Sequence, residues 1–569
     1  MEKQLKCVIV GGVAGGMSAA ARLRRLDEHA EIIVLEAGPE VSFANCGLPY
    51  FVGGEITDPA ELLVQTPESL RASLNIDVRV NHQVTSLDAE NHIVGGVGPD
   101  GPFQIGYDQL VLSPGASAMR PPIPGLDNPR VHTLRTVGDA LAMRGLVTGP
   151  TPAQSAVVLG AGFIGLEAAE ALRLQRLDVT VVEMAPHVLP PLETEMANLV
   201  QDELRRLGIG LAVGVSAQSI TDAAAGVTVT LSDGRRVPAD LVVLSAGVAP
   251  ASGPFADAGL VCDARGAILV DDIGRTNLKD VWAVGDATAS VDAVTGVRRP
   301  VPLAGPANRD GRIVADNIVA VRGGRPGRPF AKPLGSAIVR IGGLTVAMTG
   351  ANRASLQAAG IEFTTIHTHP LGHAAYFPGA KQVHLMVHMG TDGRLLGAQG
   401  VGAQNVDKRI DVLATAMRGG LTVPELIDLD LCYSPPYGSA KDPVNMIGYL
   451  ADNVLTGRLA LWQPAELDWA RREAFLLDVR SATEFAAGHV PEAVNVPHTQ
   501  LRARLDEVAA LAAGRPIAIT CQSGVRSYLA HRVLEAAGLP SRSLSGGMLT
   551  LRQWLGEAAS DVVVKDARP

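Results

Sequence analysis

Two of the five cysteines in the sequence stand where a thiol can do chemistry. The first is Cys46, in the segment SFANCGLPY. Polar turn residues precede it and a short helix is expected after it, which would place the sulfur at a helix N-terminus and lower the pKa of the thiol. Residues 48–51 supply no second cysteine, so Cys46 cannot close a local disulfide. Its oxidised form must then be a mixed disulfide, a persulfide or a sulfenic acid.

The second is Cys521, which follows an expected strand over residues 516–520 and opens the loop CQSGVRS. Backbone N–H groups around such a loop, with Arg526 closing it, form a nest that stabilises a thiolate or persulfide anion. The loop is shorter than those with which cysteine phosphatases surround phosphate, so it favours the smaller sulfur atom. The other cysteines lie in no such pattern and are interpreted as packing residues: Cys7, Cys262 and Cys432.

A strand, a glycine turn and a helix are expected just before Cys46. The apolar run 5–10 leads into the turn, and the helix is expected over residues 17–26. Glycine lets the backbone approach a diphosphate, and the helix N-terminus offers free N–H groups. The next strand, 31–35, ends at an acidic residue that would accept hydrogen bonds from ribose hydroxyls. Although Val13 replaces the usual second glycine, the pattern predicts a dinucleotide site formed by Gly11, Gly12, Ala14, Gly15 and Glu36.

A second unit of the same kind has all three glycines, Gly160, Gly162 and Gly165. It follows an expected strand over 157–159 and opens a helix that runs to residue 174. The next expected strand, 179–182, leads to Glu183. A carboxylate there would bond the 2′-hydroxyl of NADH and repel the 2′-phosphate of NADPH. NADH is therefore the expected electron donor, with NADPH as an alternative.

A third element, TNLKDVWAVGDA over residues 276–287, places Gly285 and Asp286 at the end of a buried strand. With the two glycine turns before it, the sequence resembles the flavoprotein family with two dinucleotide-binding domains that includes glutathione reductase. The resemblance implies that Asp286 binds the ribityl chain of FAD. It also implies that Cys46 lies beside the flavin and takes electrons from it.

The segment around Cys46 is similar to coenzyme A disulfide reductases and their persulfide-reducing relatives, as are the segments PLAGPANRDGR and CYSPPYGSAKDPVN. In these enzymes the cysteine attacks the substrate and rests as a mixed disulfide with coenzyme A. Two arginines three residues apart share one face of the expected first helix, where they would hold a nucleotide phosphate. The resemblance implies that these residues contact coenzyme A: Arg22, Arg25, Ser42, Asn45, Asn308 and Lys441.

Residues 329–452 resemble the dimerisation domain of the same family, with strands expected over 335–341 and 382–387 and a helix over 406–418. This implies a homodimer whose active site is shared across the interface. By the same resemblance, the phenols that protonate or orient the leaving thiolate come from the partner, and the matching positions here are Tyr376 and Tyr433, with Tyr437 as an alternative to the latter. No carboxylate or cysteine cluster accompanies His367, His369 and His373, so no metal site is predicted.

The C-terminal part looks like a rhodanese domain, from LLDVR, GHVP and the Cys521 loop. At 569 residues the chain should form three or four folding units. The predicted fold class is α/β, with two Rossmann-like FAD- and NAD(P)-binding domains, an α+β dimerisation domain and a C-terminal α/β rhodanese domain. The expected bounds are 1–115 and 250–328 for the FAD-binding domain, 116–249 for the NAD-binding domain, 329–452 for the dimerisation domain, 453–465 for a linker and 466–569 for the rhodanese domain.

Composition limits the remaining functions. Lys and Arg number 49 against 58 Asp and Glu, a net charge of −9, which leaves no basic surplus for binding nucleic acid. No stretch offers about 18 uncharged apolar residues for a bilayer. The first residues lack the apolar region and cleavage site of a secretory signal. A cytoplasmic protein without nucleic-acid or membrane partners is expected.

Together these patterns predict an enzyme that uses NADH and FAD to reduce coenzyme A persulfide, polysulfide or coenzyme A disulfide through Cys46, while Cys521 transfers sulfur to or from that site. Coenzyme A is expected as a bound cofactor or substrate. One alternative is an NADH oxidase or peroxidase that cycles Cys46 through a sulfenic acid, although no histidine stands within residues 11–17 as a peroxide acid. Another is a flavin-containing redox sensor that turns over little. The sequence does not rank the substrates or give the direction of sulfur flow.

Overall fold

The structure is a computed structural model that describes residues 4–566. Its chain divides into two compact units, one made of Met1–Pro186 and Leu207–Gly335, the other of His187–Arg206 and Ser336–Pro569. The architecture is α/β, which confirms the predicted fold class. Among residues 4–566, none of the helices combines the length and the apolar character needed to span a bilayer.

The first unit contains a parallel five-stranded sheet in the order β19–β7–β1–β2–β3. The central strands are short apolar runs that are almost wholly buried, as expected for parallel strands covered on both faces. The predicted strand 31–35 is confirmed to the residue. The bounds are β1 (Lys6–Val10), β2 (Glu31–Leu35), β3 (Asp77–Arg79), β7 (Gln109–Leu112) and β19 (Val281–Ala283).

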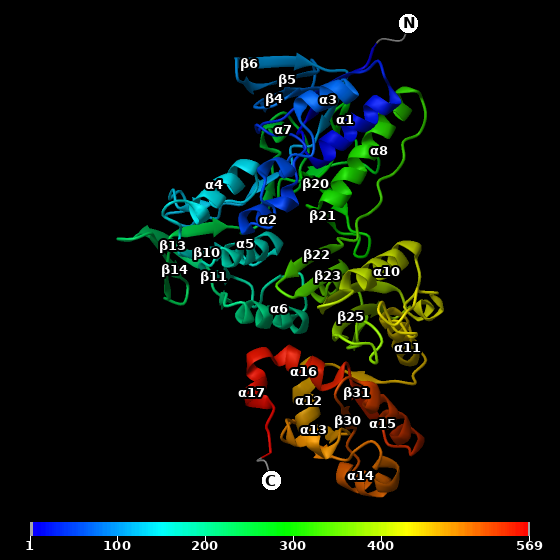
Figure 1. The fold of residues 1–569 in the computed structure, drawn as a ribbon. Helices are drawn as coiled ribbons and strands as arrows, with labels where there is room; N and C mark the ends of the chain where they lie inside the picture. The colour runs from blue at the N-terminus through cyan, green and yellow to red at the C-terminus, as the bar shows by residue number, and fades with distance from the viewer. Residues whose placement is uncertain (1–3, 567–569) are drawn as a thin grey trace. The chain divides into compact units, whose positions relative to one another are not determined.

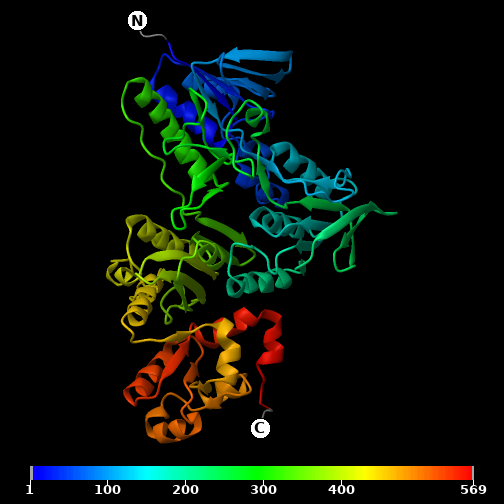
Figure 2. The same cartoon turned by 180° about the vertical axis from the view of Figure 1, so that it is seen from behind.

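Two helices, α1 (Ala14–Leu26) and α8 (Ala304–Arg322), lie side by side against this sheet in both ribbon views (Figures 1 and 2). They approach closely because Gly311 faces Gly15, and a Cβ on Gly311 would strike the Gly15 carbonyl. Gly11, at the end of β1, has φ +98°, and a Cβ there would overlap the Ser113 carbonyl. Helix α1 begins at Ala14, directly at this turn and three residues earlier than predicted.

A second parallel sheet in the first unit has the order β12–β11–β10–β16–β9. Helix α5 (Phe163–Leu174) follows β10 and ends where the sequence predicted. The turn between them repeats the first, since Gly160 has φ +103° and a Cβ there would strike the Ser245 carbonyl. The bounds are β9 (Val131–His132), β10 (Ser155–Leu159), β11 (Asp178–Glu183), β12 (Gly210–Val213) and β16 (Leu241–Leu244).

The second unit contains an antiparallel sheet in the order β22–β23–β26–β25–β24. Its two faces carry different helices. Gly400 packs against Val406 and Ile410 of α10 (Val406–Gly419), while the adjacent Gln399 accepts a hydrogen bond from the backbone of Glu193, just before α6 (Thr194–Arg206). The bounds are β22 (Ala337–Ile341), β23 (Leu344–Gly350), β24 (Phe363–Thr368), β25 (Val383–Gly390) and β26 (Leu395–Gly402).

The second unit also contains a parallel sheet in the order β27–β31–β30–β28–β29, with apolar clusters on both faces. The central strand β30 ends directly before Cys521, and α15 (Val525–Ala536) begins four residues later. Helix α16 (Gly547–Leu555) contacts α6 (Figure 1). The bounds are β27 (Leu461–Trp462), β28 (Phe475–Asp478), β29 (Val494–Asn495), β30 (Ile517–Thr520) and β31 (Ser541–Leu544).

Candidate functional site

The first glycine turn joins β1 to α1, and Glu36 closes it from the end of β2. Gly12 donates its N–H to Glu36 Oε2 (2.6 Å) and Gly38 donates to Oε1 (2.9 Å), so the carboxylate is fixed at the turn. Each oxygen keeps a lone pair that can accept from a ribose hydroxyl. No side chain caps α1, which leaves the first-turn N–H groups near Ala14 and Gly15 to an anionic ligand. These residues fit the dinucleotide part of FAD.

The second glycine turn is built in the same way. Ala161 donates its N–H to Glu183 Oε2 (2.7 Å) and Ala185 donates to Oε1 (2.8 Å). No side chain caps α5, and the space beside Gly162 is open where a Cβ would stand. A Cβ on Gly165 would strike the Gly160 carbonyl, so close packing at the turn requires glycine there. These residues fit a nicotinamide dinucleotide, with Glu183 fixed at the turn.

Asp286 follows β19 and Gly285, which has φ +81°. Burial raises the pKa of Asp286, and the charge of Arg135 acts against that shift. Burial in turn lowers the pKa of Arg135, while the charges of Asp286 and Asp139 oppose it. Arg135 was not predicted from the sequence, because it belongs to no motif; it lies just before helix α4 (Val137–Thr148).

Cys46 lies in a 3₁₀ turn, Asn45–Gly47, directly before the short helix α2 (Leu48–Gly53). The residue is exposed, yet partial burial of its thiol raises the pKa, and the charges of Glu167 and Asp286 raise it further. The expected lowering of the Cys46 pKa is therefore wrong for this structure, because shielding and two carboxylates outweigh a helix of six residues. Glu167 belongs to α5 and was not singled out from the sequence.

Ser42 and Asn45, both predicted to contact substrate, lie in the same loop as Cys46. Ser42 has φ +51° and donates its N–H to the Gly12 carbonyl (2.8 Å). Asn45 donates its N–H to the Phe43 carbonyl (3.2 Å). The loop that carries Cys46 is therefore bonded to the first glycine turn.

Three other predicted substrate residues lie on α1 and α8. Ser18 Oγ donates to Asn308 Oδ1 (2.7 Å), and Arg22 forms an ion pair with Asp316 (2.7 Å). Arg25 donates to the Ala21 carbonyl of its own helix (3.2 Å). Arg22 and Asn308 thus lie where α1 and α8 contact each other. The positive charge of Arg22 is already paired with the carboxylate of Asp316.

In the second unit, the predicted tyrosines lie together. The hydroxyls of Tyr376 and Tyr433 are hydrogen-bonded at 2.8 Å, although the residues are 74% and 47% exposed. This bond raises the pKa of Tyr376. The hydroxyl that meets Tyr376 belongs to Tyr433 and not to Tyr437. Cys432, interpreted above as a packing residue, is exposed, so that interpretation was wrong.

Lys441, the remaining predicted substrate residue, is exposed. The following residue, Asp442, accepts from the Val444 N–H (3.0 Å) and so caps helix α11 (Pro443–Leu455). Asp442 also binds the buried guanidinium of Arg409 at 3.0 Å. The backbone beside Lys441 is therefore held by a buried ion pair.

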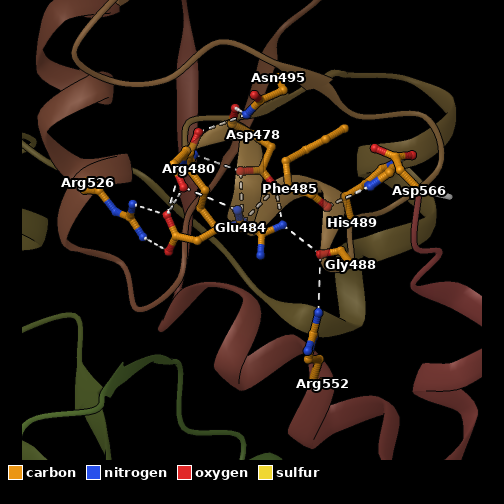
Figure 3. A network of polar contacts seen from close by, with 11 residues as sticks. Asp478, Arg480, Glu484, Phe485, Gly488, His489, Asn495, Arg526, Arg552 and Asp566 are labelled. Atoms are coloured by element: carbon orange, nitrogen blue, oxygen red, sulfur yellow. Dashed lines mark hydrogen bonds and ion pairs between the residues drawn. The ribbon is translucent and has the colours of Figure 1, made fainter. Parts of the chain in front are cut away.

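The Cys521 loop encloses its sulfur. Cys521 is 1% exposed, and its Sγ accepts the Gly524 N–H (3.1 Å) and lies 3.2 Å from Ser527 Oγ. Arg526 forms two hydrogen bonds to the carboxylate of Glu484, at 2.7 and 2.6 Å (Figure 3). The structure brings the predicted Cys521 and Arg526 into one loop and adds Glu484, which lies 42 residues before Arg526.

Two of the three histidines considered as metal ligands, His367 and His369, instead belong to a buried histidine network with α6 and α16, whereas His373 contacts the Ala374 carbonyl (3.2 Å). His367 bonds Glu195 and Ser545, each at 2.9 Å. His369 bonds Thr550 (2.7 Å) and His384 (2.9 Å). Within residues 4–566, no group of three or more His, Cys, Asp or Glu side chains is arranged to hold a metal ion. The members of the network are His367, His369, His384, Glu195, Ser545, Thr550 and Gln553.

Burial sets the charges in this network. It lowers the pKa of His384 to about 4 and that of His369 well below its usual value, so both imidazoles are neutral at pH 7. Burial raises the pKa of Glu195, but the hydrogen bond and charge of His367 and the charge of Arg353 outweigh it and hold that pKa well below its usual range. The network therefore contains one buried carboxylate, Glu195, which also forms an ion pair with Arg353 at 2.8 Å.

Comparison with known families gives three matches along the chain. A model of the pyridine nucleotide-disulphide oxidoreductase family matches residues 5–311, and a model of the dimerisation domain of that family matches 337–443. A model of the rhodanese-like domain matches 462–553. The glycine turns and Cys46 fall in the first match, the tyrosine pair in the second and the Cys521 loop in the third.

Individual proteins are similar to this chain over most or nearly all of its length. The coenzyme A disulfide reductase of Staphylococcus haemolyticus is 34% identical over 449 residues, 78% of this chain and 99% of that protein. The structure is similar to reduced CoADR-RHD of Bacillus anthracis, with a TM-score of 0.94, 38% identity and coverage of 98% and 99% of the two chains. It is also similar to an NAD-dependent persulfide reductase from A. fulgidus, with a TM-score of 0.88, 35% identity and coverage of 96% and 100%.

Proposed function

Because the chain belongs to the pyridine nucleotide-disulphide oxidoreductase family and carries a rhodanese-like domain, we propose that it reduces coenzyme A persulfide, polysulfide or coenzyme A disulfide with NADH. The observation that carries the proposal is Cys46, an exposed thiol in a loop bonded to the first glycine turn, without a second cysteine in residues 48–51. The names of the similar reductases support this substrate class.

Two dinucleotides belong to the proposal. FAD is held by Gly11, Gly12, Ala14, Gly15, Glu36, Gly285 and Asp286, and NADH by Gly160, Gly162, Gly165 and Glu183. When bound, they supply the electron pair that reduces a disulfide on Cys46. The fixed Glu183 carboxylate supports NADH over NADPH, because it would repel a 2′-phosphate.

The proposed chemistry begins with the Cys46 thiolate. It attacks the carbon-bound sulfur of a coenzyme A persulfide, forms a mixed disulfide with coenzyme A and releases HS⁻ with the bonding electron pair. A coenzyme A disulfide would release the coenzyme A thiolate instead. Tyr376 and Tyr433 donate the proton that the leaving sulfur takes up, and the raised pKa of Tyr376 keeps that proton in place until it is needed.

We place these tyrosines at the Cys46 of the partner subunit in a homodimer. The dimerisation-domain match and the exposure of the tyrosine pair support this arrangement. Arg22, Arg25, Ser42, Asn45, Asn308 and Lys441 are proposed to bind coenzyme A. Cys521 is proposed to carry sulfane sulfur, a role supported by the Gly524 N–H at its Sγ.

Mass spectrometry of the purified protein tests this function. A coenzyme A adduct on Cys46 that disappears on reduction is expected, together with NADH consumption that depends on coenzyme A persulfide. The alternative is an oxidase or peroxidase, since a lone exposed thiol also forms a sulfenic acid. Absence of the adduct, with hydrogen peroxide turned over as fast as the persulfide, would establish that alternative and reject the proposal.

A further inference from the structure

The Cys521 loop contains one charged side chain besides the reacting sulfur. Between Cys521 and Arg526 the chain supplies only Gln522, Ser523, Gly524 and Val525. A negatively charged donor entering the loop would therefore depend on Arg526 for a cation. How far that cation is available decides which sulfur donors the loop accepts.

Arg526 is already engaged. Its two terminal nitrogens donate to the two oxygens of Glu484, at 2.7 and 2.6 Å, in the bidentate geometry that matches guanidinium to carboxylate (Figure 3). The hydrogen bond from Arg526 helps to lower the pKa of Glu484 to about 2, so the carboxylate stays ionised at neutral pH. The pair is neutral, so it offers no net positive charge to a donor that reacts at Cys521.

Glu484 is held in this position by its own helix. It is the third residue of α13 (Ala482–Ala486), and its Oε2 accepts from the Ser481 N–H (3.1 Å) and Oγ (2.9 Å). These are the hydrogen bonds of a capping box. Glu484 therefore does not need Arg526 to stay in place, and it faces the loop arginine as a fixed carboxylate.

Further contacts hold the chain just before α13 and the C-terminal end of that helix. Arg480 pairs with Asp478 at 2.6 Å and donates to the Gly488 carbonyl at 2.8 Å (Figure 3). The Asp566 N–H donates to the Ala486 carbonyl at 3.0 Å, so a C-terminal segment lies along the helix end. Asp478 and Arg480 neutralise each other and add no free cation.

We infer that Glu484 is a specificity-determining residue of the Cys521 loop. By neutralising Arg526, it makes the loop prefer persulfide and polysulfane sulfur donors over the thiosulfate dianion. The inference rests on the sulfur-transfer role proposed for Cys521. With a protonated persulfide R–S–SH, the Cys521 thiolate attacks the terminal sulfur, the S–S bond of the donor breaks, and Cys–S–SH and RS⁻ form. With thiosulfate, the same attack gives Cys–S–S⁻ and sulfite. The latter donor brings two negative charges to a loop whose arginine is occupied.

The test compares loading of Cys521 by two donors in the full-length protein without NADH. Sulfur on the Cys521 peptide is followed over time by mass spectrometry, with thiosulfate or glutathione persulfide as donor. Glu484→Gln keeps an amide that can cap α13 but removes the charge. We expect the second-order rate constant for loading of Glu484→Gln by thiosulfate to rise about fivefold or more above that of the unsubstituted protein. The rate constant for loading by the persulfide should stay within about twofold.

Glu492→Gln is the matched control. Glu492 forms the same bidentate pair, with Arg471 at 3.0 and 2.7 Å, and its side chain is 41% exposed against 37% for Glu484. It should leave both rate constants unchanged. In the double variant Glu484→Gln/Arg526→Gln, the gain with thiosulfate should vanish, because no cation remains to be freed.

The outcomes separate the two levels of the proposal. If the persulfide loads Cys521 but Glu484→Gln leaves the thiosulfate constant unchanged, or lowers both constants together, the specificity role is rejected and sulfur transfer stands. An equal gain in Glu492→Gln would reject it too. If neither donor loads Cys521 in any variant, sulfur transfer at this loop is rejected along with the inference.

Discussion

Cys46 is an exposed thiol on a 3₁₀ turn, whereas Cys521 is buried in a loop at the end of a central strand. Partial shielding, Glu167 and Asp286 raise the pKa of Cys46, and within residues 4–566 no group donates a hydrogen bond to its Sγ. At Cys521 the Gly524 N–H points at Sγ, and the loop arginine, Arg526, is bound to Glu484.

This difference in exposure and hydrogen bonding suits Cys46 and Cys521 to separate tasks on one chain. A thiol that exchanges electron pairs with bound partners has to stay open, and its anion then depends on what binds beside it. A thiol that holds sulfane sulfur needs its own donors, because the persulfide must persist between encounters.

Exchanging each sulfur for oxygen should separate the two activities completely. Cys46→Ser should lower NADH-dependent reduction of coenzyme A persulfide by about a thousandfold or more, because a serine hydroxyl cannot form the mixed disulfide. The same variant should still take up sulfur at Cys521, which peptide mass spectrometry measures. Cys521→Ser should show the reverse pattern. Loss of both activities in either variant would mean that the two thiols act as one centre.

Removing a phenol should affect only the Cys46 reaction. Tyr376→Phe or Tyr433→Phe should lower kcat with coenzyme A persulfide by about a hundredfold, because the leaving sulfur loses its proton donor. Tyr437→Phe is the control and should stay within about twofold, since its hydroxyl is not part of the pair. Loading of Cys521 should be unchanged in all three variants. Equal losses in Tyr437→Phe and Tyr433→Phe would reassign the second tyrosine.

Removing a hydroxyl beside Cys521 should have a smaller effect. Ser527→Ala deletes the oxygen 3.2 Å from Sγ and should slow sulfur loading about fivefold. Ser523→Ala, in the same loop, serves as the control. NADH consumption with coenzyme A persulfide as substrate should not change in either variant. Its loss would show that the loop takes part in the reductase step.

The raised pKa of Cys46 can be lowered by a single substitution. Glu167→Gln removes a negative charge that raises the pKa of Cys46, so the thiolate should form at lower pH. The pH midpoint of iodoacetamide alkylation at Cys46 should shift downward, measured on the Cys46 peptide. Glu170→Gln removes the same charge from the same helix, and a smaller shift is expected there. An unchanged or raised midpoint in Glu167→Gln would contradict the assigned cause.

Local patterns predicted much of the fold. The strand 31–35 and the end of α5 at Leu174 were predicted to the residue, because an apolar run bounded by polar residues or glycine is a signal contained in a few neighbouring positions. The start of α1 was placed three residues late, since glycines in a first turn do not read as helix. The predicted domain bounds and site roles remain predictions.

Several features of the sites depend on contacts that no local pattern encodes. Glu167 and Arg135 influence Cys46 and Asp286 from other elements, so the direction of the Cys46 pKa shift was not predictable from its neighbours. Glu484 lies between the LLDVR and GHVP segments, but its pairing with Arg526 across 42 positions needed the fold. The exposure of Cys432 was likewise not encoded in its neighbouring residues.

The buried histidine network limits how this chain can be rearranged. A reductase cut off before the rhodanese-like domain would lose the hydrogen bonds of His367 to Ser545 and of His369 to Thr550, and losing a buried hydrogen-bond partner is unfavourable. A foreign domain grafted in its place would need matching polar side chains at the same points. The C-terminal domain therefore cannot be exchanged freely for another domain. A substitution at one residue of the histidine network has to be compensated by a substitution at its hydrogen-bond partner.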